Sequence, residues 1–445
     1  MGEIRSLSVG RYQALLIGLA ILAFTAVVFL FNLLPLGWAC GIFFGACYLV
    51  LAVRWPVWGL VLICSLLTVE GIYAGQLEMT EIRLIGIGAF GAWLAHMVIY
   101  RKRVRINSTF VAALVLFLWA GVSFLWAKDT EAAALYYGTF AQQILLFLLT
   151  INVIENERDF RLVMASLLLG AVATSQLSIN LFVTNIIERA RAFEAQDPNH
   201  YAMTVGLAII AGLYLTSMLK NIWLKLGSVL FVCLLAFPLI LAQSRSGWLA
   251  VGAGLIVFLW YTRNRLRSIL IVGAVLVGVI SASFAMGLVN ITLIRRASVM
   301  LALRERGSDR FDIWLVAGKI FADNPVLGVG YYQFPVVYNR YRVDTPGIRK
   351  DQVPSRDPHN LYFKVVTELG IVGLVLLGLI LWNIWREETL PRSKIPWITA
   401  VLLAYVMAGG IGVSIFNSKF LWLCLALASK AQTLARERLA AEEVG

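Results

Sequence analysis

Long apolar runs, separated by short polar segments, recur along almost the whole chain and constrain its fold more than any other feature. Each run is close to the roughly 20 residues that an α-helix needs to cross the ~30 Å hydrocarbon core of a bilayer. The chain has 60% hydrophobic and only 14% charged residues, whereas soluble proteins have about 45–50% apolar and about 25% charged residues. No alternation of period two competes with this pattern. The runs therefore predict an all-α polytopic membrane protein.

The apolar runs predict 12–14 transmembrane helices. They cover residues 13–31, 33–53, 56–75, 83–100, 109–126, 136–154, 162–183, 201–219, 226–243, 246–262, 268–288, 363–384, 395–412 and 416–430. The first run is too long for the core of an ordinary signal peptide and lacks a clear cleavage site, so we expect it to remain as a span. All five cysteines fall inside apolar runs, which favours small buried side chains over disulfides or a metal cluster.

The distribution of basic residues predicts how the helices are oriented. With the N-terminus in the cytoplasm, most basic clusters, including Arg101–Arg105 and Arg263–Arg267, lie on the cytoplasmic side, as the positive-inside rule requires. We then expect residues 1–288 to form transmembrane helices with short outward loops. Residues 289–362 form one long outward loop in this interpretation, and residues 363–445 form the C-terminal spans and a cytoplasmic tail.

The long outward loop has a pattern of its own. Aromatic and aliphatic residues recur at helical spacing over Asp309–Asn324, which predicts an amphipathic helix lying on the bilayer surface. Asn324-Pro325 ends this helix, and Gly328 and Gly330 predict a turn.

Three outward-facing places hold polar groups that a plain membrane helix would lack. They are Glu188–Arg191 with the following Asp197-Pro198-Asn199-His200, Ser244-Arg245-Ser246-Gly247, and Asp357-Pro358-His359-Asn360 ahead of Thr367-Glu368-Leu369-Gly370. Arg245 is the most informative, because an arginine so close to hydrocarbon costs about a few kcal/mol and usually has a partner or a task. Its planar fork suits two phosphate oxygens. A snorkelling interface arginine is the alternative, and Arg189 and Arg191 could also be solvated loop charges.

His359 is one of only three histidines and is a natural proton acceptor near neutral pH. A histidine that only caps the following helix is the alternative. His200 competes for the role of base, and Glu194, Asp197 and Asp357 could also serve.

Several signatures are absent from the sequence. It has no P-loop, no GxGxxG after a strand, no HExxH and no acidic DxD motif, so no nucleotide site is indicated. A membrane chain of this kind must use an already activated substrate or a gradient, or only bind.

The outward motifs, taken in order, resemble those of the O-antigen ligase and polymerase superfamily. The matching residues are Arg191, Asp197-Pro198-Asn199, Ser244-Arg245-Ser246-Gly247, Arg310-Phe311-Asp312-Ile313-Trp314, Asn324-Pro325-Val326-Leu327-Gly328-Val329-Gly330, His359-Asn360 and Glu368-Leu369-Gly370. The similarity covers roughly residues 185 to 385 in motif detail and the whole chain in topology.

This resemblance implies a membrane-embedded glycosyltransferase of the C type in the bacterial inner membrane, with its active site facing the periplasm. The implied donor is a glycan on undecaprenyl pyrophosphate, and the implied acceptor in the ligase branch is the lipid A–core oligosaccharide. The phosphate-binding arginines would be Arg191 and Arg245, and the catalytic histidine would be His359. The possible supporting residues are Arg189, Arg310, Asn199, Asn360 and Glu368, and neither a metal nor a cofactor is expected.

The chemistry fits these residue types. A sugar on pyrophosphate is already activated, so the enzyme needs cations to stabilise the departing pyrophosphate and a base to accept the proton of the acceptor hydroxyl. Two arginines and one histidine can supply both without a metal, by direct displacement at the anomeric carbon.

Two groups of alternatives remain open from the sequence. A polysaccharide polymerase or a protein O-oligosaccharyltransferase of the same superfamily would share every motif. A transporter or flippase is the alternative from another class, because Thr174, Ser175, Gln176, Ser178 and Asn180 could line a path, although such stripes more often hold helices together.

Overall fold

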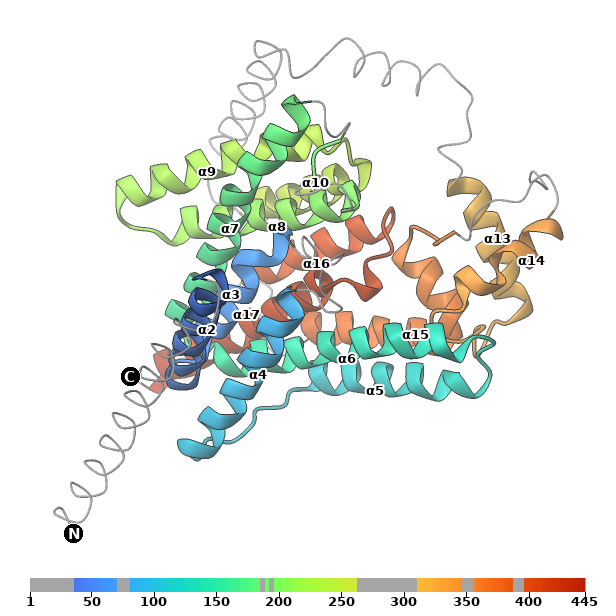
Figure 1. Cartoon of the computed structure of the whole chain (residues 1–445), viewed down its shortest axis with the longest axis horizontal. Helices are drawn as coiled ribbons and strands as arrows, with labels where there is room; N and C mark the ends of the chain where they lie inside the picture. Colours follow the sequence, from blue (N-terminus) through green and yellow to red (C-terminus); the bar gives the residue numbers. More distant parts are fainter. Residues whose placement is uncertain are drawn as a thin grey trace.

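The computed structural model describes residues 36–69, 81–184, 189–191, 196–261, 310–345, 356–386 and 396–444, and over these residues every regular element is helical (Figure 1). Seven of the described helices are long and apolar enough to cross a membrane. They are α4 (Glu81–Ile99), α5 (Ser108–Val122, extended by a 3-10 turn), α6 (Thr130–Val153), α7 (Glu157–Val183), α8 (Pro198–Met218), α9 (Ile222–Leu241) and α15 (Leu361–Arg386). The prediction of an all-α, multi-span protein is confirmed.

The described part of the chain also holds four further apolar helices, two before α4, one after α9 and one after α15. They are α2 (Leu36–Arg54), α3 (Val57–Leu66), α10 (Arg245–Tyr261) and α16 (Trp397–Gly410). The predicted spans 13–31 and 268–288, and the loop residues 289–309, lie outside the described residues. The total of 12–14 helices and the proposed division into three regions therefore stay predictions.

Short polar connections end in helix caps, which explains where several spans begin. The side chains of Asn107, Asp129, Asn156, Asp197 and Asn221 each accept a hydrogen bond from a backbone N–H in the first turn of the helix that follows. Such caps satisfy backbone donors that a helix start would otherwise leave unpaired.

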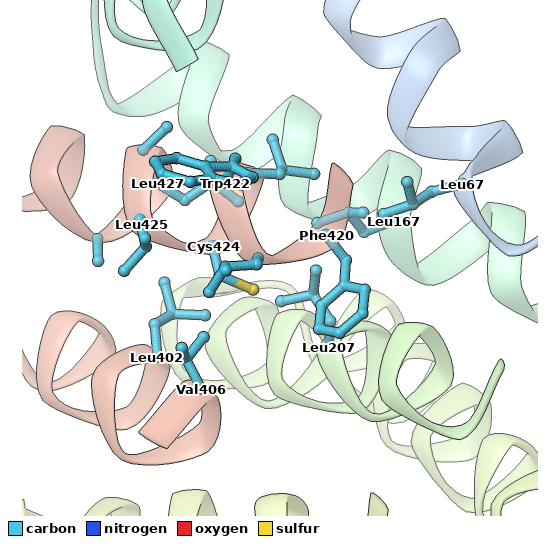
Figure 2. Packing of buried hydrophobic residues seen from close by; sticks show 14 of the residues in the cluster. Leu67, Leu167, Leu207, Leu402, Val406, Phe420, Trp422, Cys424, Leu425 and Leu427 are labelled. Carbon is cyan, nitrogen blue, oxygen red and sulfur yellow. The ribbon is translucent and has the colours of Figure 1, made fainter. Parts of the chain in front are cut away.

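The helix α17 (Lys419–Val444) forms the centre of the bundle. Every side chain from Phe420 to Ala428 is at most 2% exposed. Figure 2 shows Trp422, Cys424 and Leu425 among apolar side chains of neighbouring helices. The helix also runs on to Val444, well past the end of the predicted run 416–430.

The amphipathic helix predicted in the long loop is α13 (Arg310–Asp323), which ends directly before Asn324-Pro325 as expected. Its buried face packs against α14 (Phe334–Val343), and its Phe311 and Leu315 side chains stay exposed. Figure 1 shows α13 and α14 together at one end of α15. Its position on a bilayer surface stays a prediction.

The span predicted over residues 363–384 is interrupted, which the sequence pattern did not indicate. Within α15, Gly370 has φ 67° and ψ −168°, a conformation outside the helical region. The turn after Asn324 packs into this break. Val329 N–H donates to Thr367 O (2.9 Å), Gly330 N–H to Glu368 O (2.9 Å), and Ile371 N–H to Pro325 O (2.9 Å).

Glycine is required on both sides of this contact. A Cβ at Gly370 would overlap the Val326 carbonyl oxygen, and one at Gly328 (φ 70°) would lie 2.5 Å from the Glu368 carbonyl. The loop backbone thus satisfies polar groups that a broken helix in a membrane would otherwise leave unpaired.

Candidate functional site

The predicted polar motifs meet at one end of the bundle, here called the site end. The start of α8, the α9–α10 turn, the start of α13, the loop before α15 and the segment between α16 and α17 all lie there. Hydrogen bonds between these segments fix their arrangement. They join Arg189 to Asn199, Trp314 to Pro358, Asn360 to Ser414 and His200 to Ser418.

Arg245 and Arg310 lie close enough to influence one another. Each is the first residue of its helix, so both occupy the positive end of a helix dipole. Burial and the charge of Arg245 lower the pKa of Arg310, and the carboxylate of Asp197 acts in the opposite direction. No ion pair joins either arginine to a carboxylate within the described residues. Two neighbouring cations without a bound carboxylate favour an anionic ligand between them.

The two arginines of the 189–191 segment have different environments. The Arg189 guanidinium donates to Ala242 O (2.9 Å), Gln243 O (3.3 Å) and Asn199 Oδ1 (3.0 Å). It therefore ties the segment to the α9–α10 turn and to α8. Arg191 is half-buried, and its Nε atom is buried without a hydrogen-bond partner among the described residues. Of the two, Arg191 has the donor that a ligand could satisfy, while Arg189 and Asn199 organise the segment.

His359 is held in an unusual backbone conformation. Its φ is 48°, which is rare for a residue other than glycine. Its N–H donates to Asp357 Oδ1 (3.1 Å), while its half-buried ring has no hydrogen-bond partner in the described part of the chain. Among the described residues, the ring is therefore available to another partner.

Asn360 is buried and anchors the His359 loop. Its backbone N–H donates to Ser414 Oγ (3.1 Å) and its side-chain amide to Ile411 O (2.9 Å). Its side-chain oxygen accepts from the N–H groups of Tyr362 and Phe363, capping α15. Asn360 therefore joins the start of α15 to the segment after α16, and its supporting role in the reaction stays a prediction.

His200, the competing base, is engaged differently. Its Nδ1 lies 3.0 Å from Ser418 Oγ, and its ring packs edge-on against Phe420. It interacts electrostatically with Asp197, Asp357 and His359. Trp314 of α13 donates to Pro358 O beside His359 (3.0 Å), and a Cβ on Gly412 would meet both Ser246 Oγ and Arg310 Nη1. The helix starts at Arg245 and Arg310 and the His359 loop therefore meet at the site end.

Glu368 lies in a buried ion-pair network. Lys364, which is 2% exposed, lies 2.8 Å from Asp357 Oδ2 and 3.3 Å from Glu368 Oε1. Glu368 Oε2 also accepts the N–H of Tyr332 (2.9 Å). Burial acts to raise the pKa of Asp357, but the charge and hydrogen bond of Lys364 lower it overall. Glu368 is therefore a buried structural partner, and Asp357 is a paired carboxylate.

Four residues of this region were not predicted from the sequence: Lys364, Tyr332, Ser414 and Ser418. The i, i+4 spacing of Lys364 and Glu368 in an otherwise apolar helix is the one signal that could have indicated the ion pair. No local pattern marks the other three. Glu188 and Glu194 lie outside the described residues. Among those that are described, no group of three His, Cys, Asp or Glu side chains could hold a metal ion.

The fold and this polar site define a multi-pass helical membrane protein with a cationic centre at one end of its bundle. Residues 230–378 match the model of the O-antigen ligase family, so the chain carries an O-antigen ligase family domain over this part. The domain contains Arg245, Arg310, His359 and the break at Gly370, whereas Arg191 lies before it. Members of the family carry out glycan transfer of the ligase or polymerase type, with lipid-linked glycans as substrates. No curated protein sequence matches the chain.

Proposed function

We propose that this protein is an O-antigen ligase that transfers a glycan from undecaprenyl pyrophosphate to the lipid A–core oligosaccharide, at the periplasmic face of the inner membrane. The observation that carries the proposal is that Arg245 and Arg310, which form no ion pair with a carboxylate among the described residues, begin helices at the same end of the bundle as the His359 loop. Trp314 of α13 donates to Pro358 O in that loop (3.0 Å) and so fixes the start of α13 beside it. The family domain supports glycan transfer as the reaction class.

The proposed reaction is a single displacement without a metal. The acceptor hydroxyl oxygen attacks the anomeric carbon, and the bond from that carbon to the pyrophosphate oxygen breaks. The hydroxyl proton moves to the free imidazole of His359. Undecaprenyl pyrophosphate leaves with an added negative charge, which Arg191, Arg245 and Arg310 stabilise.

His359 is a better base than His200 in this proposal, because its ring has no hydrogen-bond partner among the described residues, while Nδ1 of His200 lies 3.0 Å from Ser418 Oγ. A positioned base typically contributes about 10²–10⁴-fold to the rate. We expect His359→Gln to lose that factor while still binding donor.

The decisive experiment uses purified protein, lipid-linked donor and lipid A–core acceptor in detergent. Arg245→Gln and His359→Gln should each lose at least about 100-fold in transfer. The matched control is Arg386→Gln, an exposed arginine at the other end of α15, which should transfer normally. Wild-type rates in folded Arg245→Gln and His359→Gln would refute the mechanism.

The same assay separates the alternatives. A polymerase would lengthen the lipid-linked glycan and leave the acceptor unmodified, a protein oligosaccharyltransferase would need a protein acceptor, and a flippase would form no product in detergent. Within the polar stripe of α7, Thr174 bonds to Thr68 (2.8 Å) and Ser175 bonds to Ala171 O (2.6 Å). The Ser175 bond lies within α7 itself, whereas the Thr174–Thr68 contact joins two elements and favours a helix-packing role for Thr174 over a transport path.

A further inference from the structure

Lys364 connects two backbone segments that have the same unusual conformation. His359 (φ 48°) and Tyr332 (φ 58°) are both non-glycine residues with positive φ. In each, a carboxylate accepts the backbone N–H: Asp357 for His359 (3.1 Å) and Glu368 for Tyr332 (2.9 Å). The ammonium group of Lys364 bridges these two carboxylates.

The environment of this bridge makes it rigid. Lys364 and Glu368 are 2% and 1% exposed, so water does not compete for their ion pair. The Lys364 ammonium also lies 5.0 Å from the centroid of the Tyr332 ring, which stacks on Tyr136 with centroids 3.4 Å apart. The two carboxylates and the aromatic ring together stabilise the buried positive charge of Lys364.

Such strained residues persist only when their surroundings hold them, and they concentrate at functional sites. We propose that Lys364 is a positioning residue that, through Asp357 and Glu368, holds the His359 and Tyr332 backbones and thereby aims the His359 imidazole at the acceptor hydroxyl. This inference rests on the proposed function of His359. In this role, Lys364 links the first turns of α15 to the turn around Tyr332, which follows the segment that packs into the break at Gly370.

The test is a double-mutant cycle between Lys364 and His359 in the in-vitro transfer reaction. Lys364→Met should lower kcat by about 10–100-fold, within the range a base contributes, with the donor KM within about threefold of wild type. In the His359→Gln background, the same Lys364 change should cost less than about threefold, because groups that act as a unit are non-additive. Equal losses in both backgrounds would overturn the inference.

Lys364→Met leaves two carboxylates without their cation, which strongly destabilises a buried ion pair, so a second variant accompanies it. Lys364→Met/Glu368→Gln removes one buried positive and one buried negative charge, and keeps an acceptor for the Tyr332 N–H. The remaining Asp357 side chain is 33% exposed and tolerates its charge. The double variant should fold, bind donor and still show the kcat loss; wild-type kcat in this variant would also overturn the inference.

Lys102→Met is the matched control. Lys102 also pairs with a glutamate, Glu155, but both side chains are more than 40% exposed and lie at the opposite end of the bundle. This variant should transfer at the wild-type rate. If His359→Gln alone transfers normally, the proposed function of His359 fails; if His359→Gln is impaired but Lys364 behaves additively, only the positioning role fails.

Discussion

The break in α15 at Gly370 predicts how strongly a substitution there should lower the free energy of unfolding. Gly370→Ala places a Cβ where the Val326 carbonyl oxygen lies, in a backbone conformation with φ 67° and ψ −168°. That region is essentially restricted to glycine and costs other residues about 1–3 kcal/mol. Moving the loop away would weaken three backbone hydrogen bonds, each with a net contribution of about 1 kcal/mol. We expect a destabilisation of about 3–5 kcal/mol.

Gly378→Ala is the control for this change, because it is the same substitution in the same helix. Gly378 has helical geometry, and nothing lies within 4 Å of its added Cβ. Alanine there should stabilise the helix by up to about 1 kcal/mol. The free energy of unfolding of both variants would be measured in mixed micelles, with transfer activity alongside. If Gly370→Ala is as stable as Gly378→Ala, the proposed packing of the loop into the break is wrong.

Three further results are expected. Arg310→Gln should lower kcat/KM for the donor by about tenfold or more, and less so at high salt, because it removes one of two adjacent cations; an unchanged value would place Arg310 outside the anion site. The pKa of Asp357 is lowered in the folded protein. Its ion pair with Lys364 therefore stabilises the fold fully above the unfolded pKa of about 3.9, and this stabilisation is lost as the pH falls below that value. The stability difference between wild type and Asp357→Asn should therefore be constant from about pH 5 to 7 and shrink below about pH 4; thermal unfolding across pH checks this, and a difference that grows on acidification would contradict it. Trp119→Phe should cost about 1 kcal/mol, because it removes the indole hydrogen bond to Leu369 O (3.0 Å) beside the break; an unfolding free energy equal to wild type would show that this bond contributes nothing.

The strained residues of the site end are not distributed at random. Among the described residues, four non-glycine residues have positive φ, and three of them, Gln243, Tyr332 and His359, lie at the site end. Gln243 accepts a hydrogen bond from Arg189 through its carbonyl, and the other two are held by the Lys364 network. The fold therefore concentrates its backbone strain where the proposed chemistry needs fixed groups.

Sequence patterns predicted those elements whose structure depends on only a few neighbouring residues. The helix α13 begins and ends within one residue of the predicted 309–324 segment, because amphipathic spacing and Asn324-Pro325 are both contained in a few residues. The break at Gly370 could not be predicted in this way, since an apolar run around one glycine has the same composition whether the helix continues or not. It is the docking of residues 325–330 that makes the break stable.

The sequence by itself determined that the chain is a multi-pass helical membrane protein, and it located the polar motifs that gather at one end. Only the tertiary structure decided which of these polar groups are free and which are paired: Arg189 and Glu368 have protein partners, whereas the Arg191 Nε and the His359 ring have none in the described part of the chain. Hydropathy is a property of neighbouring residues, which a sequence displays directly. Pairing depends on contacts such as His200 with Ser418, 218 residues apart, and these exist only once the bundle has packed.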